Sequence, residues 1–273
     1  METGIKVPNI IDVCLKANMS VEEVNTFLDL AKRSMEPFSK RISVTENGAM
    51  RYYSVERRGI GVLKTKYGKF WQYNFLVDDQ WERYSVIVKA ELNKDLLIPV
   101  FSNKDQLILR IDSGCETGQV FGDLTCECRD QLHLSLRTLE NIGEGMLINI
   151  PRQDGRGMGL TFKLATLWIQ DILWVNTVES ATLLAPGGVI DIRTYSGIIC
   201  ILKFFNIPRT CQIHLETNNP QKATVFAENG YAIADYIPVV IKPNKYTEAH
   251  LRAKQNILGH KGLIKKGGKN ENK

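Results

Sequence analysis

The order of strand-like and helical patterns along the chain indicates a mixed α/β fold. From residue 58, strand-like pieces follow one another between Gly, Asn and Asp residues, and helical patterns then alternate with short apolar strands. The strand-like pieces are 70–77, 84–92, 97–102 and 106–111, and the alternating part comprises 131–142, 145–150, 160–174, 195–207 and 211–217. Antiparallel strands followed by mixed β-α units predict an α+β (mixed α/β) domain.

The N-terminal part of the chain has a different pattern. Residues 9–18 and 21–35 carry apolar side chains at helical spacing, and Ser20 with Glu23 forms a capping-box start for the second segment. We expect residues 1–57 to be a small helical extension that serves packing or oligomer contacts rather than a separate functional domain. The main domain should then span 58–262, and the basic end, 263–273, should be a solvated, disordered tail.

The overall composition indicates where in the cell the protein is located and which kinds of partner it binds. No apolar run approaches the roughly 20 residues of a membrane span, and the N-terminus lacks the pattern of a signal peptide. We therefore expect a cytoplasmic protein, in which clustered cysteines suggest metal binding or catalysis more than disulfides. The net charge of +5 suits a polyanionic small ligand at least as well as nucleic acid. Basic and aromatic residues are not interleaved, so neither nucleic acid nor membrane is an expected partner.

Three of the six cysteines stand close together as C-x10-C-x-C, at Cys115, Cys126 and Cys128. Zinc favours thiolate and imidazole ligands, and a catalytic zinc site uses three protein ligands and leaves one position open. Three thiolates with an open position would suit hydrolysis. The spacing alone is equally compatible with three buried, reduced cysteines.

Downstream segments suit an anionic ligand, although each is weak evidence alone. Arg152 and Arg156 stand among three glycines at a helix entrance, where backbone N–H groups and guanidinium groups converge on phosphate. Asp191 and Arg193 occupy alternate positions, so an extended backbone points both to one side. The segments are "PRQDGRGMGL" (151–160), "GGVIDIRTYSG" (187–197) and "LETNNPQK" (215–222).

Taken in order, these segments resemble the GTP cyclohydrolase II family, which opens riboflavin biosynthesis in bacteria, fungi and plants. The family pattern runs R-x-H-S-E-C-x-T-G-D, C-x-C-G-x-Q-L, R-Q-E-G-R-x-I-G-L, D-x-R-x-Y and T-N-N-P-x-K. This chain has "RIDSGCETGQ", "CECRDQL", "RQDGRGMGL", "DIRTY" and "TNNPQK" at similar spacing. The resemblance covers roughly residues 61–262 and raises the zinc interpretation well above the alternative of three structural cysteines.

The resemblance implies a homodimeric enzyme that binds GTP with Mg²⁺ on the phosphates and releases pyrophosphate. It further implies that water on Zn²⁺ opens the imidazole ring of guanine and that C8 leaves as formate. The implied zinc ligands are Cys115, Cys126 and Cys128. Asp191 matches the family's proton acceptor, and Arg193 matches an arginine proposed to attack the α-phosphorus; a simpler role for Arg193 is a cation that stabilises phosphate charge. The implied nucleotide-binding residues are Arg110, Ile111, Asp112, Ser113, Gly114, Gln131, Asp154, Gly155, Arg156, Thr177, Thr217 and Lys222.

The chain departs from the family pattern at several of these positions. The family's His and Glu before the first cysteine are Asp112 and Gly114 here, and the Gly after the last cysteine is Arg129. Four residues beyond a lysine the family carries a tyrosine, whereas this chain has Leu167 after Lys163. Leucine cannot donate or accept a hydrogen bond or orient water, so we expect Leu167 to alter specificity.

Because the departures fall within the site while the metal ligands remain, the sequence predicts a zinc-dependent hydrolase that opens the ring of a guanine nucleotide. One alternative is a ring-opening enzyme that stops at the formamide product, or that acts on another nucleotide, as in uracil breakdown or specialised metabolism. The other is a catalytically silent nucleotide-binding protein. Retention of Asp191 and Arg193 beside all three cysteines argues against silence.

Overall fold

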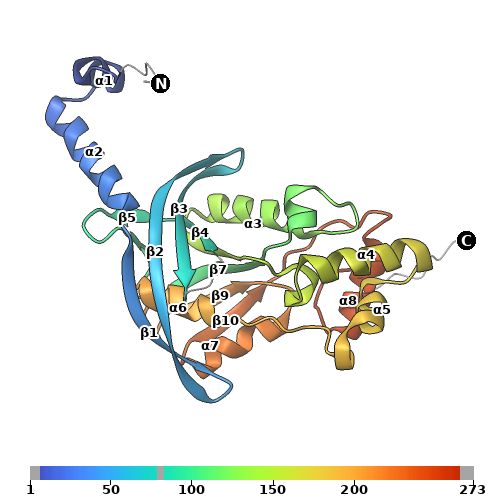
Figure 1. Ribbon diagram of the computed structural model, residues 1–273. Coiled ribbons are helices and arrows are strands. Elements are labelled where there is room, and N and C mark those ends of the chain that lie inside the picture. Colours follow the sequence, from blue (N-terminus) through green and yellow to red (C-terminus); the bar gives the residue numbers. More distant parts are fainter. Residues whose placement is uncertain (1–6, 79–82, 265–273) are drawn as a thin grey trace, which may run out of the picture.

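The computed structural model describes residues 7–78 and 83–264, and its centre is one large mixed sheet (Figure 1). The eight strands are ordered β1-β2-β3-β4-β8-β7-β9-β10, and β5 and β6 form a separate two-stranded sheet. The strands are β1 (Phe38–Glu46), β2 (Ala49–Thr65), β3 (Gly68–Val77), β4 (Arg83–Lys89), β5 (Glu91–Asn93), β6 (Ile98–Val100), β7 (Gln106–Ser113), β8 (Gly145–Ile150), β9 (Gln212–Glu216) and β10 (Ala232–Ile237).

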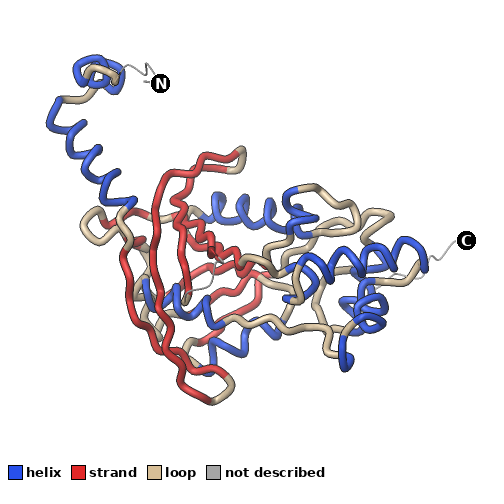
Figure 2. Tube along the Cα trace, viewed as in Figure 1, coloured by secondary structure: helices blue, strands red, loops and turns tan. Residues whose placement is uncertain are grey.

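Helices lie around this sheet, and several gather at one end of the molecule. Figures 1 and 2 show α4, α5 and α8 on the side far from β1 and β2, while α1 and α2 extend away from the sheet. The α-helices are α1 (Ile10–Ala17), α2 (Val21–Met35), α3 (Cys128–Ile142), α4 (Leu160–Leu173), α5 (Thr177–Leu184), α6 (Ser196–Phe204), α7 (Thr224–Glu228) and α8 (Glu248–Ile257). Short helices are η1 (Glu116–Val120), η2 (Asp154–Gly157), η3 (Pro186–Gly188) and η4 (Pro220–Ala223).

The strand pairing of the sheet changes from antiparallel to parallel at β8. Strands β1 to β4 and β8 pair antiparallel, whereas β8, β7, β9 and β10 pair parallel. This arrangement confirms the predicted α+β class. No helix within 7–78 or 83–264 is long and apolar enough to cross a membrane.

The core lies between the sheet and α6, whose sequence is apolar on nearly every side. A helix of this kind is stable only when it is buried, and most of α6 is inaccessible to solvent. Aromatic rings join it to the sheet: the ring centroids of Phe75 and Phe204 lie 4.9 Å apart, and those of Tyr73 and Phe205 also lie 4.9 Å apart. Edge-to-face pairs of this type fix the position of α6 against β3.

The predicted N-terminal helices are confirmed, but the predicted extent of the helical extension is wrong. The capping box of Ser20 and Glu23 starts α2, and α2 ends at Met35. Residues 38–57 belong to β1 and β2, so the expected boundary at residue 57 falls inside β2. The reason is the alternating pattern of β1, which buries Ile42 and Val44 on one face.

The first two residues of the predicted disordered tail are ordered. Leu263 is buried, and the backbone N–H of Ile264 donates to Gln255 Oε1 at 3.0 Å. These two residues therefore belong to the folded part of the chain. The rest of the predicted tail, 265–273, lies outside the described residues.

The parallel part of the sheet positions the candidate site. Strands β7, β8 and β9 run in the same direction and end at Ser113, Ile150 and Glu216. The segments that follow them therefore meet at one edge of the sheet. In open α/β sheets the carboxyl ends of the strands are where ligands bind.

Candidate active site at the carboxyl edge of the sheet

A pocket at this edge brings together most of the residues predicted from the sequence. Its walls come from the ends of β7 and β9, the segment after β8, the start of α3, and parts of α4, α5 and the C-terminal segment. The predicted residues that line it are Arg110, Asp112, Ser113, Cys115, Cys126, Cys128, Gln131, Asp154, Gly155, Arg156, Thr177, Arg193, Thr217 and Lys222.

The three cysteines form a compact sulfur cluster. Cys115 follows β7, Cys126 lies in the turn before α3, and Cys128 is the first residue of α3. Their Sγ atoms all lie within 4.8 Å of one another, and those of Cys115 and Cys126 are 3.6 Å apart. Gly118 packs directly against the cluster: a Cβ at this position would stand 2.7 Å from Cys126 Sγ, so a side chain there would displace the sulfur.

This donor set fits zinc. At a Zn–S distance of about 2.3 Å, tetrahedral geometry places two sulfurs about 3.8 Å apart, close to the spacing of Cys115 and Cys126. Hydrogen bonds from Cys126 and Cys128 lower the pKa of Cys115, and the resulting thiolate raises the pKa values of the other two thiols. Three thiolates therefore require a cation among them, which a divalent metal ion supplies. Within the described residues, this is the one group of three Cys, His, Asp or Glu side chains arranged to hold a metal.

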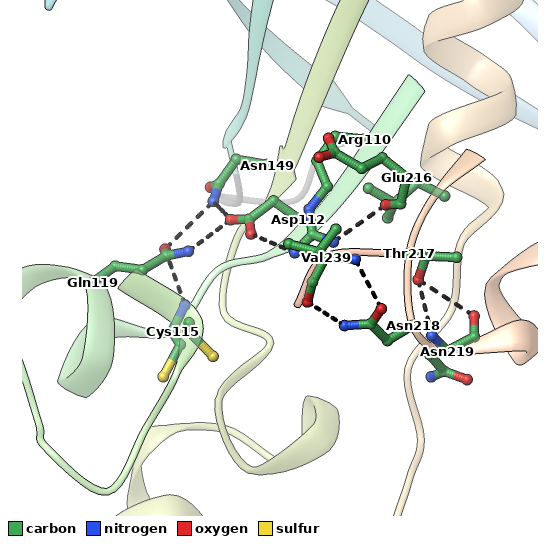
Figure 3. A network of polar contacts seen from close by, with 12 residues as sticks. Arg110, Asp112, Cys115, Gln119, Asn149, Glu216, Thr217, Asn218, Asn219 and Val239 are labelled. Carbon is green, nitrogen blue, oxygen red and sulfur yellow. Dashed lines mark hydrogen bonds and ion pairs between the residues drawn. The ribbon is translucent and has the colours of Figure 1, made fainter. Parts of the chain in front are cut away.

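A buried polar network supports the backbone of Cys115 (Figure 3). Asp112, which is fully buried, accepts hydrogen bonds from Gln119 at 2.7 Å, from Asn149 at 2.6 Å and from Arg110 at 3.4 Å. Gln119 Oε1 in turn accepts the backbone N–H of Cys115 at 3.3 Å. Both carboxylate oxygens of Asp112 are thus engaged within the chain, although the residue stands at the pocket wall.

The glycine-rich segment after β8 presents Arg156 to the pocket. The Nη2 atom of Arg156 donates to the carbonyl oxygen of Thr177 at 3.1 Å and to its hydroxyl at 3.3 Å, which joins this segment to the start of α5. Asp154 accepts the backbone N–H of Glu116 at 3.0 Å. Burial and the nearby Cys115 raise the pKa of Asp154. The segment therefore links the sulfur cluster to the side of the pocket that carries the cations Arg156, Arg193 and Lys222, which is called the cationic end below.

Asp191 and Arg193 form a two-pronged ion pair. Arg193 donates to Asp191 through Nε at 2.9 Å and through Nη2 at 2.5 Å. Burial alone would lower the pKa of Arg193, but the hydrogen bonds and charge of Asp191 outweigh it and raise that pKa. Burial opposes ionisation of Asp191 as well, yet the hydrogen bonds from Arg193 lower the pKa of Asp191 overall. Arg193 lines the pocket, whereas Asp191, which holds it, does not.

Lys222 is a buried cation on the same side. Its Nζ donates to the carbonyl oxygen of Ile111 at 2.8 Å. Burial, followed by the charges of Arg110 and Arg193, lowers the pKa of Lys222 well below that of an ordinary lysine. Thr217, which precedes it in the same turn, accepts the backbone N–H of Asn219 at 3.1 Å, as Figure 3 shows. An anion in the pocket would stabilise the charged form of Lys222.

Ile111, Gly114 and Leu167 were also predicted but do not line the pocket. Ile111 is a core residue of β7 that contributes its carbonyl to Lys222. A Cβ at Gly114 would lie 2.6 Å from the carbonyl oxygen of Ile150, so the close approach of backbone requires glycine. Leu167 is half-buried on α4, whereas its neighbour Thr166 faces the pocket.

The sequence interpretation missed several pocket residues. Four of them, Glu127, Gln153, Asn218 and Asn219, stand in segments that were quoted for the resemblance and could have been found there. Lys254 and His260, which lie in the C-terminal segment, had no local signal. Burial and the cations Lys254, Arg193 and Lys222 lower the pKa of His260 to about 4, so its imidazole is neutral at neutral pH.

Comparison with known proteins agrees with this geometry. The family model described as GTP cyclohydrolase II matches residues 56–238. The chain belongs to the GTP cyclohydrolase II family. It is 37% identical over 198 residues to "GTP cyclohydrolase-2" of Picrophilus torridus, which covers 72% of this chain and 94% of the relative. It is 35% identical over 207 residues to "GTP cyclohydrolase-2" of Campylobacter hominis, covering 76% and 95%.

A third relative is longer. The chain is 32% identical over 235 residues to "Riboflavin biosynthesis protein RibBA" of Phocaeicola vulgatus, which covers 85% of this chain and 54% of that protein. The family membership predicted from the motifs is confirmed, as is the prediction of a GTP cyclohydrolase II-like hydrolase.

Proposed function

We propose that this protein is a zinc-dependent hydrolase that opens the imidazole ring of GTP and releases pyrophosphate. The observation that carries the proposal is the close sulfur cluster in the same pocket as Arg156, Arg193 and Lys222. A single pocket thus offers a metal site for hydrolysis and a cationic site for a polyphosphate. The family and the names of the relatives support GTP as the substrate.

The chain's own groups would hold the metal and the base end of the nucleotide. Cys115, Cys126 and Cys128 would bind zinc, which when bound supplies a Lewis acid able to lower the pKa of water from 15.7 to about 7. Gln131 lines the pocket one helical turn after Cys128, and we infer that its amide would hydrogen-bond the base. The network around Asp112 would keep Cys115 in place through Gln119.

At the phosphate end we infer that Arg193 acts as a cation. The raised pKa of Arg193 and its two-pronged bond to Asp191 oppose the loss of a guanidinium proton that nucleophilic attack would require. A fixed, charged fork beside the phosphates instead stabilises the charge that develops as pyrophosphate leaves. Asp191 then acts as the residue that orients Arg193.

The identity of the final product is a separate question, and Leu167 favours a second candidate. Leu167 has no hydroxyl to orient a second water molecule for removal of the formyl group. On this basis the reaction would stop at the ring-opened formamide rather than release formate.

Mass spectrometry of GTP incubated with zinc-loaded protein tests these candidates together. Pyrophosphate with stoichiometric formate supports the complete reaction, and pyrophosphate with a formylated product supports the second candidate. Unchanged GTP in the presence of bound zinc would contradict both and would indicate a silent nucleotide-binding protein. A panel of other nucleoside triphosphates run in parallel would reveal another substrate.

We further infer that the protein uses Mg²⁺ with its substrate and forms a homodimer. Mg²⁺ would arrive with the phosphates, since the described residues offer the cysteine group alone as a protein metal site. A homodimer would find an apolar surface on α4, where Leu164, Trp168 and Ile172 are exposed. Light scattering of the purified protein would test the dimer. From the sequence we infer a cytoplasmic location.

A further inference from the structure

The C-terminal segment forms one wall of the pocket. The family match ends at residue 238, yet Lys254 of α8 and His260 beyond it line the pocket with the cysteines. Leu251 and Ala253 are buried, which shows that α8 packs firmly against the rest of the molecule. This wall is therefore a fixed part of the site.

Hydrogen bonds attach the segment to several sides of the pocket. Asn244 donates through Nδ2 to the carbonyl oxygen of Leu124, two residues before Cys126, at 3.3 Å. The ring of His250 accepts the backbone N–H of Thr177 at 3.1 Å. These bonds hold the C-terminal segment, which includes α8, against both the turn that carries two of the cysteines and the start of α5.

An ion pair makes the most direct connection to the cysteines. Lys254 Nζ lies 2.6 Å from Oε1 of Glu127, the residue between Cys126 and Cys128. The Glu127 side chain is 7% exposed and that of Lys254 is 20% exposed. The second oxygen of Glu127, Oε2, is buried and has no hydrogen-bond partner in the described part of the chain. The carboxylate is thus held on one side, by Lys254.

Loss of one partner costs more in a largely buried ion pair, such as that of Lys254 and Glu127, than in an exposed pair. Two exposed partners gain little from their attraction, because water solvates either one when the other is removed. Removal of Lys254 would instead leave the buried carboxylate of Glu127 without its partner, so the turn would have to move to solvate or neutralise it.

We propose that Lys254 is a positioning residue for the metal site, which acts through Glu127 to hold the turn from Cys126 to Cys128 in the geometry that binds zinc. The inference rests on the proposed function, because it concerns the same metal site. It assigns to α8 a role in the site: the helix holds two of the three ligands in place.

Charge and position predict opposite effects on the metal, which makes the proposal testable. Removal of a cation near the site would by charge alone favour Zn²⁺ and slow its release. Removal of a positioning contact speeds release, because the ligands lose their fixed geometry. Partners of metal ligands typically change metal affinity about 10- to 100-fold when mutated.

The experiment measures zinc loss from the full-length protein to an excess of a chromogenic chelator. We expect Lys254→Met to lose zinc about 10- to 100-fold faster than the unmodified protein. The matched control is Arg252→Met, which removes a cation from the same helix whose partner Glu248 lies 2.7 Å away in an exposed pair. The visible absorption of the Co²⁺-loaded protein, which reports ligand geometry, should change for Lys254→Met and not for Arg252→Met.

A second variant tests the route through Glu127. Glu127→Gln keeps the size of the side chain and should also speed zinc loss, and the double variant should lose zinc no faster than the worse single variant. Equal retention by Lys254→Met and Arg252→Met, slower loss from Lys254→Met, or additive effects in the double variant would each overturn the proposal. If Lys254→Met does not fold, Lys254→Gln, which removes the same charge and keeps a polar group beside Glu127, carries the same prediction. Failure of the proposed function has a different signature: the unmodified protein would bind no zinc, or Cys126→Ser would retain it.

Discussion

The end of the pocket with Arg156 and Arg193 and the end with the three cysteines differ in how far the chain's own groups hold the side chains in place. At the cationic end, Arg193 is held by Asp191 and Arg156 by Thr177, with every contact made within the chain. At the sulfur end, ionisation of Cys115 raises the pKa values of its two neighbours. The cationic end is therefore ordered before any ligand binds, whereas the sulfur end requires a bound cation to complete it.

From this difference we infer that the two halves of the proposed reaction are separable. A guanidinium fixed by a carboxylate can bind phosphate whether or not a metal is present. Three neighbouring thiolates exist only around a metal ion. Variants at the sulfur end should therefore abolish ring opening while leaving phosphate binding in place, and variants at the cationic end should slow pyrophosphate release while leaving the bound metal in place.

The largest effect is expected for Cys126→Ser. Loss of one ligand should remove zinc and reduce ring opening by more than the about 10²–10³-fold that removal of a single transition-state donor costs. The affinity for GTP should change little, because the cationic end is intact. Metal analysis, product mass spectrometry and calorimetric titration of GTP measure the three quantities. Full zinc retention with lost turnover would remove Cys126 from the set of ligands, and lost GTP binding would show that the two ends are coupled.

The second variant, Arg193→Lys, addresses the cationic end. It keeps the charge but loses the fork that matches Asp191, so pyrophosphate release should slow by about 10²-fold. Zinc content should stay at the level of the unmodified protein. A coupled pyrophosphate assay measures the rate, and Asp191→Asn provides the complementary change. Pyrophosphate release at the unmodified rate would exclude both roles considered for Arg193.

A third prediction concerns the pH dependence of pyrophosphate binding. Burial and neighbouring cations lower the pKa of Lys222, so in the empty pocket this side chain loses its proton at a lower pH than an ordinary lysine. Binding should therefore weaken as pH rises past that lowered pKa, by up to about tenfold per pH unit. Lys222→Arg should abolish this dependence, because arginine stays charged. Calorimetry over a pH series tests it, and identical pH profiles for the two proteins would contradict the assignment.

Much of the candidate site could be predicted from the sequence, because its residues stand in recognisable motifs. The three cysteines, Asp191 and Arg193 stand in segments whose spacing is specific, and the structure brings the cysteines and Arg193 to one pocket. The capping box of α2 was equally readable, because Ser20 and Glu23 are neighbours in sequence.

The features that could not be predicted depend on contacts between residues far apart in the sequence. The strand character of β1 is weak locally, since polar residues occupy its outer face, and it is fixed by pairing with β2. Lys254 becomes meaningful only when α8 places it against Glu127, 127 residues away in sequence. Nothing in the sequence near either residue specifies that contact.

The smallest effect is expected for Leu167→Tyr, which sharpens the comparison at the sulfur end. Leu167 is half-buried next to Thr166 at the pocket wall, so a longer side chain at this position could carry a hydroxyl toward the site. A positioned acid–base group contributes about 10²–10⁴-fold, but this hydroxyl would not be held by partners, so we expect formate release to rise only about threefold. Leu167→Phe, with the same ring and no hydroxyl, should leave formate release unchanged. An equal rise in the Phe variant would attribute the effect to ring packing, and stoichiometric formate from the unmodified protein would show that Leu167 does not limit the second hydrolysis.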